Sequence, residues 1–171
     1  EQGETNFAVE EFVEVVNVDL AGALDSRIDL ALGALDHARV QSIDPALLPG
    51  LEVAVARLGQ AFRLNAVSVR EAWAVLHQWM QRPDLDVTQP GHAYLWLKGL
   101  AYLAAPIMPR LAEYLWQRLG HDGLPLIQAL YAASQPRLQA WLRPRFAPLS
   151  PAALAPCLPA SVVLAGAASD A

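Results

Sequence analysis

The sequence predicts an all-α fold, an antiparallel bundle of about five helices followed by a proline- and alanine-rich C-terminal tail. Apolar residues recur at spacings of three and four in several segments, and no long segment alternates with the period of two typical of strands. Residues 161–164 are the only run that suits a short strand. With 54% hydrophobic residues, 171 residues are enough to bury one core. We therefore predict a helical domain over residues 1–143 and a tail over residues 144–171.

The first helix is expected over residues 8–39. Its apolar residues follow one helix face, whereas its acidic residues lie on the other faces. The apolar set is Phe12, Val16, Leu20, Leu24, Ile28, Leu32 and Leu35. Asn6 is the candidate N-cap, and Glu10 and Glu11 suit the positive end of the helix dipole.

Two further helices are predicted over residues 51–63 and 68–81. Ser68 precedes Glu71 by three residues, which is the spacing of a capping box. The stretch from Arg82 to Gly91 is expected to be a loop, because prolines and a glycine bracket polar residues that show no apolar period.

A kinked or paired helix is expected over residues 92–119. Pro106 removes a backbone donor and crowds the preceding turn, whereas Pro109 suits the first turn of a new helix. Gly120 is placed to end that helix. Residues 125–142 are expected to hold one or two short helices.

The net charge of -5 argues against a strong, sequence-blind nucleic-acid binder, which normally shows a basic stripe. The twelve basic residues are Lys98 and eleven arginines, with no run of adjacent cations. Local phosphate contacts remain open, because exposed charges act over only about 8 to 10 Å. The charge-free stretch 146–169 contains four prolines, so no membrane-spanning helix is expected.

The chain begins at Glu1 without a signal-peptide pattern, so we expect a domain excised from a longer cytoplasmic polypeptide. The single Cys157 cannot form an internal disulfide, which agrees with a reducing compartment. Neither a catalytic nor a metal site is expected, and no cofactor. The four histidines are scattered, there is no phosphate-binding glycine loop, and Asp25 and Asp29 are best explained as a solvated face.

The five tryptophans are candidates for stacking on unpaired bases. Four of them lie in or beside apolar helical stripes, where core packing is the better interpretation. Trp96, close to His92, Tyr94 and Lys98, is the strongest candidate for a base contact.

Two segments resemble the helical anticodon-binding domain of class I aminoacyl-tRNA synthetases, most closely the methionyl type. The first is residues 5–21, which contain Asn17-Val18-Asp19-Leu20-Ala21. The second is residues 106–120 followed by His121-Asp122-Gly123, which is similar to the proline-broken helix pair of the methionyl, leucyl and valyl members. The two segments stand in the family's order, and the ordered pair is more specific than either segment alone.

The resemblance implies a helical bundle that positions a tRNA anticodon stem-loop. In that family the bundle is appended to a separate Rossmann-type catalytic domain, whose signature motifs are not found in this chain. The implied partners are therefore tRNA and a catalytic synthetase-like domain, attached covalently or separate. In this interpretation phosphates are contacted by Arg27, Arg63, Arg70 and Lys98, and a loop base stacks on Trp96 or His92.

The chain also departs from the family pattern. Methionyl enzymes place an Asn and an Arg four residues apart just after the Asp-Leu-Ala segment, where this sequence has Ser26 and Leu30. The family's aromatic residue after the third helix has no clear equivalent between Arg82 and Gly91. A second class of function therefore stays open: a synthetase-derived scaffold or protein-interaction domain that has lost anticodon readout, or part of a repurposed amide-forming biosynthetic enzyme.

Overall fold

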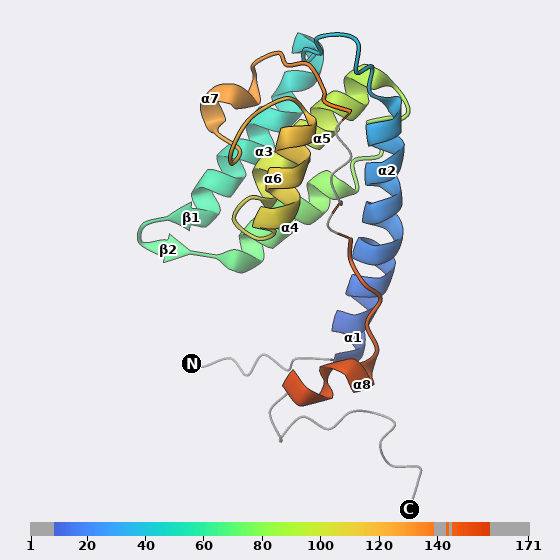
Figure 1. The fold of residues 1–171 in the computed structure, drawn as a ribbon. Coiled ribbons are helices and arrows are strands. Elements are labelled where there is room, and N and C mark those ends of the chain that lie inside the picture. Colours follow the sequence, from blue (N-terminus) through green and yellow to red (C-terminus); the bar gives the residue numbers. More distant parts are fainter. Residues whose placement is uncertain (1–8, 139–142, 144, 158–171) are drawn as a thin grey trace, which may run out of the picture. The chain divides into compact units, whose positions relative to one another are not determined.

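The structure is a computed structural model that describes residues 9–138, 143 and 145–157 (Figure 1). The predicted all-α class is confirmed, since helices dominate and the only strands in the described part form one short hairpin. The α-helices are α1 (Val9–Glu14), α2 (Asp25–Ala34), α3 (Leu48–Ala61), α4 (Val69–Met80), α5 (Pro90–Ala104), α6 (Pro109–Arg118), α7 (Ile127–Leu130) and α8 (Pro151–Leu154). The strands are β1 (Phe62–Arg63) and β2 (Ala66–Val67). Asn6 and the candidate strand 161–164 lie outside the described residues.

The chain divides into two compact units, residues 27–144 and residues 1–26 together with 145–171. The division before the C-terminal segment lies one residue from the predicted boundary at 143, but residues 1–26, which were predicted to belong to the helical domain, group with that segment. The described part of the C-terminal segment therefore belongs with the start of the first helix.

In the unit formed by residues 1–26 and 145–171, the Asn17 side chain pairs with both backbone groups of Leu149. Its Nδ2 donates to the Leu149 carbonyl at 2.8 Å, and its Oδ1 accepts from the Leu149 N–H at 2.7 Å. Asp25 accepts a third bond from the N–H of Phe146 at 3.2 Å. The extended backbone before α8 is thus held by side chains of the first helical segment.

Helical residues run without a break from Val9 to Ala34, but Val15–Leu24 has π-helical hydrogen bonding. The helix ends five residues before the predicted position 39. Its end coincides with a turn in which the Asp36 carboxylate accepts the N–H of Ala38 at 3.0 Å. Such a local side-chain bond competes with continuation of the helix.

In the unit of residues 27–144, α5 packs against α3, α4, α6 and α7. All residues from Ala93 to Ala101 are buried, as expected for a helix in which Lys98 is the single charged residue and apolar residues occupy the other faces. The predicted proline break is confirmed, since a turn at residues 105–108 separates α5 from α6, and Pro109 lies in the first turn of α6. Gly120 follows with a φ of +94°, which suits a glycine after a helix end.

The third predicted helix begins as expected, because the Ser68 hydroxyl accepts the N–H of Glu71 at 3.2 Å. The second predicted helix ends two residues early, where the β1–β2 hairpin replaces its last turn. Antiparallel pairing joins Phe62 to Val67 and Arg63 to Ala66. The hairpin projects beyond the ends of α3 and α4 (Figure 1), and its two-residue strands are too short to show a periodic sequence signal.

Candidate nucleic-acid interface

Arg27, on α2, is tied to the C-terminal end of α4. Its guanidinium donates to the carbonyls of Met80 (2.9 Å), Arg82 (2.5 Å) and Leu85 (2.9 Å). It also lies 4.9 Å from the ring centroid of Trp96. Burial lowers the pKa of Arg27 from its usual value. Its donors are directed at the last carbonyl of α4 and at two carbonyls of the loop that follows, so Arg27 is a structural residue, and the expected phosphate contact is inconsistent with this arrangement.

Trp96 has no exposed surface. Its indole N–H donates to the carbonyl of Trp79 at 3.2 Å, and the indole of Trp79 donates to the carbonyl of Trp96 at 3.0 Å. The expectation that Trp96 stacks on an RNA base is therefore wrong for this conformation, because the ring is part of the core. The alternative interpretation of the tryptophans as core residues holds for Trp79, Trp96 and Trp116, each at most 2% exposed.

Lys98 is also completely buried. Its ammonium donates to the carbonyls of Ala129 (2.9 Å) and Ala132, at the end of α7, and lies 5.2 Å from the ring of Tyr94. Burial lowers the pKa of Lys98 to about 8. A phosphate contact by Lys98 is excluded in this conformation. A sequence signal for burial existed, since Lys98 is the one charged residue between Gly91 and Pro109.

His92 lies half-buried in the first turn of α5. Its Nδ1 accepts the backbone N–H of Asp86 at 3.2 Å, so the ring stabilises the loop between α4 and α5. In that loop Arg82 pairs with Asp84, and Thr88 bonds to Asp86. The two exposed carboxylates make this loop an unfavourable place for RNA phosphates.

Arg63 and Arg70 have a different environment from the other four candidates. Arg63 lies in β1 and Arg70 in the first turn of α4, and both are exposed. Within the described part of the chain, neither has an ion-pair or hydrogen-bond partner for its side chain. The neighbouring Phe62 is 37% exposed. Of the six predicted residues, only these two have an exposed guanidinium without a partner in the described part of the chain, and Phe62 precedes Arg63 in β1.

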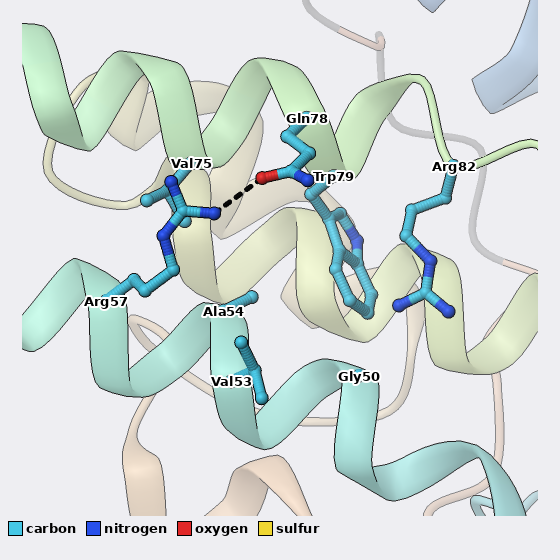
Figure 2. Close-up of a pocket in the computed structure, with 8 residues that line it drawn as sticks. All are labelled: Gly50, Val53, Ala54, Arg57, Val75, Gln78, Trp79 and Arg82. Atoms are coloured by element: carbon cyan, nitrogen blue, oxygen red, sulfur yellow. Dashed lines mark hydrogen bonds between the residues drawn. The ribbon is translucent and has the colours of Figure 1, made fainter.

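A cavity of about 280 Å³ lies between α3 and α4 (Figure 2). It was not predicted, because its lining combines residues from two helices with Arg82 of the following loop. The lining residues are Gly50, Val53, Ala54, Arg57, Val75, Gln78, Trp79 and Arg82.

Among the described residues, no group of three or more His, Cys, Asp or Glu side chains is placed to hold a metal ion. Over the same residues, no helix has both the length and the apolar character that a membrane span requires. Comparison with protein-family models, curated proteins and solved structures finds no match to this chain.

Proposed function

We propose that this chain is a tRNA-binding, anticodon-binding-like domain of a methionyl-type class I synthetase or synthetase-like protein. In this proposal its RNA contact lies at the hairpin corner, which we define as residues 57–70, comprising the end of α3, the β1–β2 hairpin and the start of α4. Amino-acid activation is assigned to a separate catalytic domain. The ordered pair of synthetase-like segments supports the family, and the charge of the hairpin corner supports the location.

The charge pattern around the hairpin is the observation on which the location depends. Residues 53–70 contain Arg57, Arg63 and Arg70 and no Asp or Glu, in a chain whose net charge is -5. An unpaired guanidinium binds a phosphate through two parallel hydrogen bonds without first breaking an ion pair. The partly exposed ring of Phe62 offers a face on which an unpaired base can stack.

The location differs from the one implied by the methionyl enzymes. The position corresponding to the family's arginine is Leu30, which is 57% exposed, and its neighbour Asp29 pairs with Arg143 at 3.0 Å. The loop after α4 carries Asp84 and Asp86. The proposal therefore retains tRNA binding but does not include the methionyl mode of anticodon readout.

A protein-interaction domain is the second candidate, and the apolar side chains of the same corner favour it. Leu64 is fully exposed, and Val67 and Val69 are 64% and 63% exposed. Contiguous exposed apolar residues are typical of protein–protein contacts. A catalytic synthetase-like domain is the partner that this candidate implies.

The test is a titration of fluorescently labelled bulk tRNA with the chain at low and at near-physiological salt. The proposal predicts saturable binding that weakens with salt and is lost in an Arg63→Ala, Arg70→Ala double variant. An Arg39→Ala variant is the control, because Arg39 is exposed but pairs with Asp36. No binding at either salt concentration would contradict an autonomous RNA-binding role.

A Leu64→Ser variant separates the two candidates. It changes no charge and removes the most exposed apolar side chain of the hairpin. Unchanged tRNA binding is expected for RNA recognition by the arginines. If the chain instead binds a separately produced synthetase-like catalytic domain, and Leu64→Ser abolishes that binding, the interaction role is favoured.

A further inference from the structure

The cavity between α3 and α4 has an apolar floor with a guanidinium group at each end. Val53 and Ala54 contribute from α3, and Val75 and Trp79 from α4. Arg57 and Arg82 lie at opposite ends, with Trp79 between them (Figure 2). The lining contains no carboxylate. This arrangement is complementary to a molecule with an apolar body and negative charge.

The charge of Arg57 is not compensated within the described part of the chain. Its Nη1 donates to the Gln78 side-chain oxygen at 2.5 Å (Figure 2), and none of the described carboxylates pairs with it. Gln78 is a neutral acceptor, so it orients the guanidinium without neutralising it. The Nε and Nη2 hydrogens remain available to an incoming anion.

Arg82 supplies a donor at the other end. Its Nε and Nη2 are engaged by Asp84, and its guanidinium lies 5.1 Å from the ring centroid of Trp79. Its Nη1 lies against Gly50, since a Cβ added to Gly50 would be 2.3 Å from that nitrogen. Gly50 therefore makes room for Arg82 at this end of the cavity.

We propose that this cavity binds a small organic anion with an apolar body, either a carboxylate or a phosphate monoester. The anionic group is held by Arg57, whose orientation is set by Gln78. The apolar body of the ligand packs against Val53, Ala54 and Val75 and extends to Trp79. At the far end, Arg82 Nη1 donates a hydrogen bond to an acceptor on the ligand. The volume of about 280 Å³ is near the lower end of the ~300–1,000 Å³ typical of small-molecule sites. This proposal does not depend on RNA binding.

The test is an NMR titration of the ¹⁵N-labelled chain with four probes: 3-phenylpropionate, its uncharged analogue 3-phenylpropanamide, phenyl phosphate and inorganic phosphate. The proposal predicts saturable shifts at the Gly50 amide and the Gln78 side-chain amide with at least one aromatic anion. The uncharged amide should bind at least about tenfold more weakly, which is the effect of losing about 1.4 kcal/mol of charged interaction. The two aromatic anions distinguish a carboxylate from a phosphate ligand.

Three substitutions make the test specific. Arg57→Gln should weaken anion binding at least about fivefold, consistent with loss of a charged hydrogen bond from an exposed side chain. Gly50→Ala should weaken it by displacing Arg82, whereas Gly59→Ala on the same helix should have no effect, since nothing lies within 4 Å of its added Cβ. Equal affinity for the acid and the amide would overturn the proposal. The proposal would also be overturned if inorganic phosphate bound as tightly as phenyl phosphate, or if the Arg57→Gln variant bound the aromatic anions with the affinity of the wild type.

Discussion

Trp79 and Trp96 exchange hydrogen bonds, each indole N–H donating to the backbone carbonyl of the other residue, at 3.0 and 3.2 Å. Both side chains are at most 2% exposed. Because of the two hydrogen bonds, both indole N–H groups have a partner inside the core. The exchange joins α4 to α5 near the C-terminal end of α4, where Arg27 also binds. It explains why Trp96 is a structural residue despite its polar neighbours in the sequence.

Gly99 makes room for this pair, and Gly99→Ala should destabilise the fold. A Cβ at Gly99 would lie 2.2 Å from Cζ2 of Trp79, whose rigid, buried ring cannot move aside at low cost. We expect a loss of about 1–3 kcal/mol or more in the free energy of unfolding, measured in urea. Gly59→Ala is the matched control and should stabilise by about 0.5–1 kcal/mol. Effects of the same sign would contradict this explanation.

Arg27→Ala should also reduce stability. The substitution leaves the carbonyls of Met80, Arg82 and Leu85 without the guanidinium that they share. Since hydrogen bonds to a charged group contribute about 1.5–3 kcal/mol each, a loss of about 2 kcal/mol or more is expected in chemical denaturation. Arg63→Ala, on the exposed hairpin, should stay within about 0.5 kcal/mol of the wild type. Equal, small effects would show that Arg27 is not a structural residue.

Acidification should destabilise the fold through His121. Burial, together with the positive charges of Lys98 and Arg137, lowers the pKa of His121 from 6.5 to about 4. Because the unfolded state then binds the proton more tightly, stability is lost as the pH falls from 6.5 toward about 4. His121→Phe keeps an aromatic ring next to Trp116, 4.3 Å away, and removes the titrating group. The urea midpoint of His121→Phe should change less with pH over that range than the midpoint of the wild type. Identical pH profiles of the two proteins would show that His121 does not cause the loss of stability.

Asn17→Ala should loosen the segment before α8. The substitution removes both hydrogen bonds to Leu149, each contributing about 0.5–1.5 kcal/mol. Trypsin cleavage after Arg145 should therefore be roughly tenfold faster, as followed by mass spectrometry. Asn65→Ala, in the hairpin turn, is the control and should cleave at the wild-type rate. An unchanged rate in Asn17→Ala would show that the amide pair does not hold this segment.

Helical periodicity was sufficient to predict the all-α class and most helix positions. The Ser68 cap and the break between Ala104 and Pro109 were also predicted, because capping residues and prolines act through their own backbone neighbours. The premature end of the first helix was missed, since the bond from the Ala38 N–H to the Asp36 carboxylate competes with helix continuation, and helical periodicity does not report such a competition.

The candidate site was harder to predict because a charged residue's partners come from distant parts of the chain. Arg27 binds carbonyls 53 to 58 residues away, and Lys98 binds carbonyls 31 and 34 residues away. Sequence spacing does not predict hydrogen bonds between residues so far apart in the chain. In contrast, the stretch around Arg63 and Arg70 contains no acidic residue, and the sequence alone shows this. The net charge of the whole chain, which is negative, does not reveal such a local positive stretch.

The slope of the logarithm of the tRNA association constant against the logarithm of the salt concentration tests the central claim most directly. If Arg57, Arg63 and Arg70 contact phosphates, the slope should be about -2 to -3, since each contact contributes about -0.7 to -0.9. Arg63→Ala and Arg70→Ala should each reduce its magnitude by about 1. A slope near zero, or one that neither substitution changes, would contradict RNA binding at the hairpin corner.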